Sequence, residues 1–186
     1  MSPPNFNSPN SKLNQSNCPP WHVVEKKIQE EINWLRDSIE TFTKKEKYSP
    51  IACRECLMRR IAILIVSGKV RATEITKSPP LQSFWKVKNK IKRINKSKIF
   101  HGKDWHRKTI EQIENHFLSC GCKIVREPTL YWGRADLGVY KRGECDLLIE
   151  VGTTSFYKLW INLEMSKNSI YLIVPNDDKL IEFICS

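Results

Sequence analysis

The chain has 186 residues, of which 40% are hydrophobic, so it is long and apolar enough to bury a core of ordinary size. Its 31 lysine and arginine residues outnumber its 20 acidic residues, and the formal net charge is +11. So basic a chain favours a polyanionic partner, most simply nucleic acid, although a basic protein that is merely soluble is the alternative. No apolar run approaches the roughly 20 residues of a membrane-spanning helix, so we expect no membrane partner.

The N-terminal 20 residues are rich in proline, asparagine and serine. This composition predicts a disordered tail over residues 1–20. The tail lacks the apolar segment of a secretory signal, so we expect an intracellular, cytoplasmic protein.

The seven cysteines are odd in number and scattered, unlike the disulfide framework of a small secreted protein. Cys53 and Cys56 have the spacing of a metal-binding pair, and Cys18 and His22 could join them, but no second pair completes a zinc site. Buried thiols on a helix are the favoured interpretation, and a disulfide is a further alternative.

Residues 21–80 are expected to form a helical region. Apolar residues from Val24 to Phe42 recur every three or four positions, which predicts a helix that begins at Trp21 and ends in the charged run at 44–47. A second helix is expected from Ile51 to Ser67, with Gly68 after its last turn. The two helices could pair as a hairpin, whereas a role of the first helix in a homodimer is the alternative.

Residues 81–104 form a basic linker or arm. Within it, seven basic residues have no acidic residue between them: Lys86, Lys88, Lys90, Lys92, Arg93, Lys96 and Lys98. Such a stripe would contact phosphates and release counterions, so these residues are a candidate nucleic-acid-binding surface. A solvated linker is the alternative.

From about residue 105 the pattern becomes that of a small α/β domain, residues 105–186, with the element order α-β-β-β-α-β-β. Helices are predicted over 104–119 and 155–165, and strands over 122–126, 135–140, 145–151, 170–174 and 180–184. The turn at 141–143 makes an antiparallel hairpin of the second and third strands, and the third, nearly all apolar, is expected to be central. The fourth strand follows a helix and can lie parallel to the third, while the short last strand is expected at an edge.

Two acidic residues interrupt these apolar strands, where a buried unpaired carboxylate is costly. Asp136 opens the second strand, and Glu150 lies near the end of the third. Pairing about the 141–143 turn places residue 136 beside residue 149 or 150, so both carboxylates could reach one cation. Paired oxygen ligands suit Mg²⁺ (or Mn²⁺), which takes one or two carboxylates together with water and substrate phosphate.

This arrangement resembles the PD-(D/E)xK, or restriction-endonuclease-like, nuclease superfamily, in which a helix precedes an acid on one strand and an acid-x-Lys on the next. Arg134-Ala135-Asp136 stands in the place of the first motif, and Glu150-Val151-Gly152 in that of the second. The resemblance implies a restriction-endonuclease-like mixed β-sheet and metal-dependent cleavage of DNA phosphodiester bonds, as in endonucleases, resolvases and small virus- or plasmid-encoded nucleases.

Gly152 stands where the superfamily has its lysine. The resemblance makes Lys158, on the following helix, the candidate for the lysine's role, with a surface lysine as the alternative. It also makes Glu114 the candidate third acid in the preceding helix, against an ordinary exposed glutamate. Arg126 and Arg134 could contact phosphate beside the site. Competing interpretations are a non-catalytic nucleic-acid-binding protein on the same fold and a dimeric regulatory protein.

Overall fold

The computed structural model describes residues 19–40, 43, 53–76, 103–130, 133–176 and 179–186. Residues 1–18 of the predicted tail, the predicted helix end at 44–47 and the basic residues Lys86 to Lys98 lie outside this part of the chain. What the sequence predicts for these segments stays a prediction.

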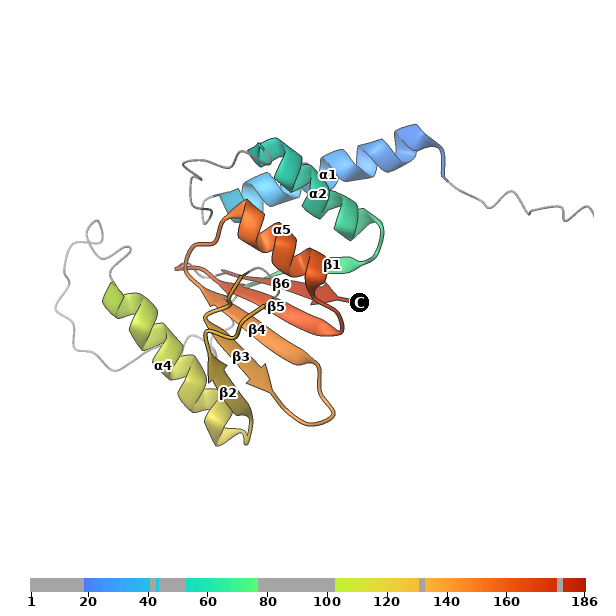
Figure 1. The fold of residues 1–186 in the computed structure, drawn as a ribbon. Helices are drawn as coiled ribbons and strands as arrows, with labels where there is room; N and C mark the ends of the chain where they lie inside the picture. The colour runs from blue at the N-terminus through green and yellow to red at the C-terminus, as the bar shows by residue number, and fades with distance from the viewer. Residues whose placement is uncertain (1–18, 41–42, 44–52, 77–102, 131–132, 177–178) are drawn as a thin grey trace, which may run out of the picture.

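The described residues form one open, mixed sheet of six strands, in the order β1-β6-β5-β4-β3-β2 (Figure 1). The strands are β1 (Val70–Thr76), β2 (Lys123–Arg126), β3 (Leu137–Tyr140), β4 (Asp146–Val151), β5 (Ser169–Val174) and β6 (Lys179–Cys185). Strands β4 and β5 are parallel, and all other neighbouring strands are antiparallel. The predicted α/β class, the β3–β4 hairpin and the parallel pairing after a helix are therefore confirmed.

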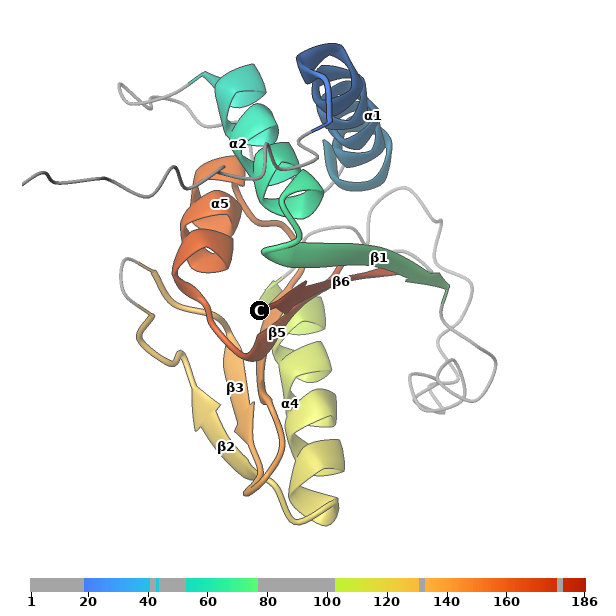
Figure 2. The same ribbon diagram turned by 90° about the vertical axis from the view of Figure 1, so that its right-hand side faces the viewer.

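Helices cover both faces of this sheet. They are α1 (Trp21–Ile39), α2 (Arg54–Val66), α4 (Lys103–Ser119) and α5 (Phe156–Met165). Helices α1, α2 and α5 lie on one face and α4 on the other (Figure 2). Among the described residues, no helix combines the length and the apolar character needed to cross a membrane.

Strand β4 lies inside the sheet, between β5 and β3. Its side chains therefore alternate between two cores. Leu148 packs in the core beneath α1, α2 and α5, whereas Ile149 and Val151 pack in the core beneath α4. All four residues from Leu148 to Val151 are buried. The nearly all apolar composition of β4 therefore has the physical cause that the sequence predicted, namely burial on both faces.

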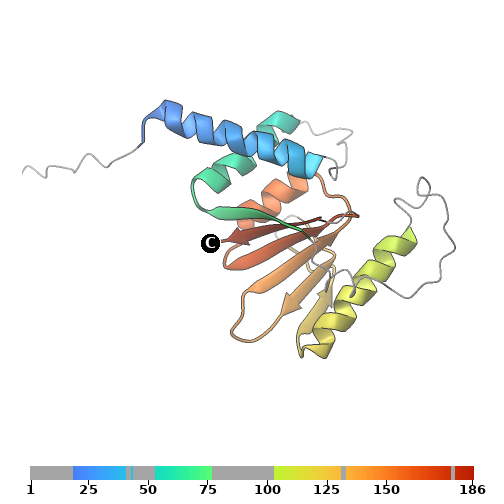
Figure 3. The same cartoon turned by 180° about the vertical axis from the view of Figure 1, so that it is seen from behind.

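The N-terminal region contributes a strand as well as helices. Gly68, with a φ of +77°, ends α2, and β1 then pairs antiparallel with β6 along its whole length. The prediction that the last strand lies at an edge is therefore wrong, because β6 lies between β1 and β5 and the edges are β1 and β2 (Figure 3). Local sequence could not reveal this, because the partner of β6 lies about a hundred residues earlier in the chain.

The predicted pairing of the first two helices is confirmed. Ile32 and Leu35 of α1 and Leu57 and Ile61 of α2 belong to one buried cluster. The Arg59 guanidinium also donates to both carboxylate oxygens of Glu25, at 2.7 and 2.6 Å. The same cluster includes residues of α5 and the sheet, so the hairpin is packed onto the α/β region.

Candidate active site

Glu150 carries its carboxylate into the space between β4 and α5. Its side chain is 6% exposed, and Lys158 Nζ lies 2.7 Å from both carboxylate oxygens. A buried carboxylate without a counter-charge would be costly, so the ammonium offsets the charge of Glu150. The lysine that the sequence placed on the following helix is thus brought to the acid on the preceding strand.

The start of α5 determines where Lys158 points. The Ser155 side chain caps the helix by accepting a hydrogen bond from the Lys158 N–H at 3.1 Å, so Lys158 lies in the first turn. Long side chains on a helix lean toward its N-terminus, and here that direction leads back to the end of β4.

Gly152 has a φ of +88°, a conformation that is costly for any residue with a side chain. Its N–H donates to the Val174 carbonyl at 2.8 Å, which holds the chain in this conformation. A Cβ at this position would lie 3.5 Å from the Trp105 ring of α4. A side chain at this position would therefore point toward α4.

Asp136 lies just before β3, where the chain bends. Its N–H donates to the Ile149 carbonyl at 2.9 Å although Leu137 is the residue paired with Ile149, so two residues oppose one, as in a β-bulge. The Asp136 Oδ2 accepts a hydrogen bond from the Val151 N–H at 2.6 Å and lies 3.3 Å from His106 Nε2. The carboxylate is therefore held at the end of β4 on the side of α4.

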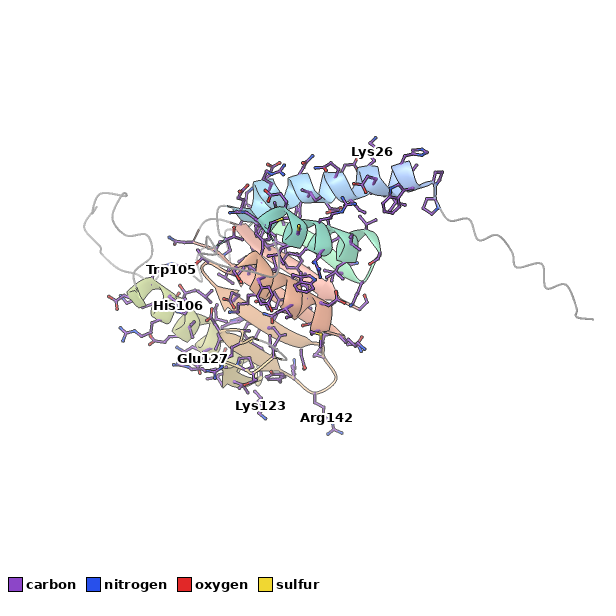
Figure 4. All side chains as sticks on the ribbon, turned by 45° about the horizontal axis from the view of Figure 1, so that its top comes forward. Lys26, Trp105, His106, Lys123, Glu127 and Arg142 are labelled. Carbon is purple, nitrogen blue, oxygen red and sulfur yellow. The ribbon has the colours of Figure 1, made fainter. Side chains whose placement is uncertain are left out.

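The carboxylates of Asp136 and Glu150 lie at the same end of the sheet but contact different helices. Asp136 meets His106 in the first turn of α4, and Glu150 meets Lys158 in the first turn of α5. Figure 4 shows Trp105 and His106 at this end of α4. The expected position of residue 136 beside residue 149 or 150 is confirmed, since Leu137 pairs with Ile149. A helix N-terminus carries partial positive charge, so both helix starts favour an anion here.

The two carboxylates are donors of the type that a hard divalent cation takes. Within the described part of the chain, the contacts of the Asp136 carboxylate engage only Oδ2, and its side chain is 21% exposed, which leaves Oδ1 for a further ligand. Among the described residues, no group of three or more His, Cys, Asp or Glu side chains is arranged around a metal position. A cation held by Asp136 and Glu150 would therefore be completed by water or a substrate oxygen, as is usual for Mg²⁺.

Two polar side chains form a series of hydrogen bonds that reaches Glu150 from the side of the core. The Asn162 side-chain amide donates to the Tyr171 hydroxyl at 3.1 Å, and that hydroxyl donates to Glu150 Oε2 at 3.4 Å. Burial and the negative charge of Glu150 raise the pKa of Tyr171 well above its ordinary value, so the phenol stays neutral and remains a donor. Tyr171 and Asn162 thus fix one oxygen of Glu150 from the core side.

Glu114 and Arg126 pair with each other. The Arg126 Nε lies 3.2 and 3.1 Å from the two Glu114 carboxylate oxygens, and Nη2 also contacts Glu114. Glu114 lies eight residues beyond His106, which is about 12 Å along the helix. The structure does not bring Glu114 to Asp136, and His106 is the α4 residue found there. Arg134 pairs with Glu127 at 3.1 Å and is 66% exposed.

Sequence reasoning assigned no role to His106, because a lone histidine without a spaced partner carries no signal. The available clue was its place in the chain. His106 lies in the first turn of the helix that precedes the strands, and that turn faces the strand ends that carry the two acids.

The N-terminal region supports the loop between β4 and α5. Thr43 forms an isolated parallel bridge with Thr154 in this loop. The Arg54 guanidinium donates to Thr43 Oγ1 at 2.8 Å and lies 5.1 Å from the centre of the Phe156 ring. The first residue of α2 therefore braces the first residue of α5, close to Lys158 in sequence.

A separate depression of about 860 Å³ lies between α1 and β1. It is lined by Glu30, Glu31, Trp34 and Arg71, among others, and by none of the predicted site residues. Burial and the neighbouring Glu30 raise the pKa of Glu31. The depression adds nothing to the chemistry at Asp136 and Glu150.

We compared the chain with protein-family models, with curated proteins and with solved structures, and found no significant match in any of the three.

Proposed function

We propose that the chain is a metal-dependent nuclease that cleaves DNA phosphodiester bonds, as an endonuclease or resolvase-like enzyme, with Mg²⁺ or Mn²⁺ as cofactor. The observation that carries the proposal is the contact of Lys158 Nζ with both oxygens of Glu150, on the strand beside Asp136. An acid on one strand, a second acid on the next strand and a lysine beside the second acid form the pattern of the superfamily that the sequence resembles.

The order of elements gives further support. A helix, an antiparallel meander of three strands, a crossover helix and a parallel strand follow one another in the order that the resemblance implies. The net charge of +11 favours a polyanionic substrate. The partial positive charge at the starts of α4 and α5 favours a phosphate at the same end of the sheet.

Each side chain has a distinct role in this proposal. Asp136 and Glu150 would hold the cation, whose chemistry when bound would be to activate a water molecule and to neutralise charge on the scissile phosphate. Lys158 balances the charge of Glu150 and orients the attacking water or contacts the phosphate. His106 orients the Asp136 carboxylate, as Tyr171 orients that of Glu150.

The test is nicking of supercoiled and branched DNA in Mg²⁺ or Mn²⁺ by the full chain and by Asp136→Asn, Glu150→Gln and Lys158→Met. We expect each substitution to abolish nicking. The matched control is Glu164→Gln, which removes another carboxylate of α5 paired with a lysine, Lys69, at 2.7 Å. It should nick like the wild type. Metal-dependent nicking that survives substitution of both Asp136 and Glu150 would rule out this site.

A second candidate function is non-catalytic nucleic-acid binding on the same fold. The observation that favours it is the burial of Glu150, which is 4% exposed and has both oxygens engaged by Lys158. This alternative predicts salt-sensitive DNA binding without nicking in either metal, and binding that is unchanged in Glu150→Gln.

A further inference from the structure

Two thiols meet at the N-terminus of α2, away from the candidate active site. Cys53 is the N-cap residue of α2, and its Sγ lies 2.7 Å from the Sγ of Cys56. Both residues are exposed, so the expectation of buried thiols on a helix is wrong. The cause lies at the helix start, where the side chains of the N-cap and of the residue three positions later meet above the first turn.

The two sulfurs lie closer together than two ligands of one zinc ion would. Two thiolates on one tetrahedral Zn²⁺ lie roughly 3.8 Å apart, given a Zn–S distance of about 2.3 Å. The pair here is much closer than that. In addition, no third His, Cys, Asp or Glu ligand is grouped with the two thiols within the described part of the chain.

The two cysteines are chemically unequal. The Cys53 Sγ is in hydrogen-bond contact with the Cys56 Sγ, and it accepts a hydrogen bond from the Cys56 N–H at 3.4 Å. These contacts lower the pKa of Cys53, whereas the side-chain contact with Cys53 raises the pKa of Cys56. The positive end of the helix dipole also favours a thiolate at the N-cap. Cys53 is therefore the nucleophile and Cys56 the thiol that resolves.

We propose that Cys53 and Cys56 form a redox-active dithiol that exchanges with small disulfides of the glutathione class. The Cys53 thiolate attacks one sulfur of the small disulfide, forms a mixed disulfide and releases one thiol. Cys56 then loses its proton and attacks the Cys53 sulfur, which releases the second thiol. The two cysteines are oxidised to one intramolecular disulfide, and one small disulfide is reduced to two thiols.

The sequence provides a direct readout. Trypsin cleaves after Lys47, Arg54 and Arg59, so Cys53 and Cys56 fall on different peptides, 48–54 and 55–59. The full chain is equilibrated in buffers of varied ratio of reduced to oxidised glutathione, alkylated, digested and analysed by mass spectrometry. We expect the two peptides to become linked under oxidising conditions and to separate fully when reduced glutathione is restored.

Single variants separate the two steps. Cys56→Ser should stop at a glutathione adduct on peptide 48–54. Cys53→Ser, in which serine keeps the helix cap, should lose the linked species. Cys145→Ser removes another exposed cysteine and should leave the linkage unchanged. Independent alkylation of both peptides in the most oxidising buffer would overturn the proposal, and so would linkage that appears only after a chelator has removed zinc.

Discussion

The contact between Glu150 and Lys158 makes a quantitative prediction about stability. In Lys158→Met the side chain keeps its length but loses its charge, which leaves the Glu150 carboxylate 6% exposed and without its ammonium partner. Removal of one partner from a fully buried ion pair costs about 3–5 kcal/mol. Because the Lys158 side chain is 30% exposed, water can reach part of the site. We therefore expect a loss of about 2–4 kcal/mol in the free energy of unfolding.

The reverse substitution should cost less. In Glu150→Gln the ammonium of Lys158 can turn toward water, so we expect a loss of about 1–2 kcal/mol. The double variant contains neither buried charge and should be no less stable than Lys158→Met. The summed losses of the two single variants should therefore exceed the loss of the double variant by about 1–2 kcal/mol.

The assay is urea unfolding of the four proteins at pH 7, with melting temperature as a second measure. A change of 1 kcal/mol in the free energy of unfolding shifts the melting temperature by roughly 2–4 °C in a chain of this size. The control cycle uses Lys26, which is labelled on α1 in Figure 4, and Glu30. The two charged groups lie 3.9 Å apart, and their side chains are 79% and 61% exposed. Its coupling should stay below about 0.5 kcal/mol. Strict additivity at Glu150 and Lys158 would refute the electrostatic account of the pair.

Three further predictions follow from the same region. Gly152→Ala should lower the free energy of unfolding by about 1–2 kcal/mol, because its φ of +88° is strained for alanine; an unchanged urea midpoint would contradict this. The raised pKa of Tyr171 stabilises the fold below the unfolded pKa of about 10, and this stability is lost as pH rises above it. Wild type should therefore lose stability relative to Tyr171→Phe in urea unfolding above pH 10, and parallel pH profiles would speak against it. His106→Ala should reduce nicking about 10–100-fold if His106 orients Asp136, whereas full activity would remove that role.

The sequence by itself determined the elements that depend on local pattern. The apolar run of β4, the turn at 141–143 and the helical period of α1 each reflect interactions between residues close in the chain. Two acids at neighbouring strand positions followed from the hairpin alone, because the turn sets the register. Lys158 on the next helix followed from the resemblance.

Only the tertiary structure decided the features that join distant segments. The pairing of β1 with β6, which moves the last strand into the interior, depends on packing across about a hundred residues of chain. The bulge at Asp136 turns its carboxylate toward His106, and the positive φ of Gly152 leaves the neutralisation of Glu150 to Lys158. The directions of these side chains depend on bends and crossovers of the chain in three dimensions. Sequence periodicity shows only which face of a helix or strand is apolar.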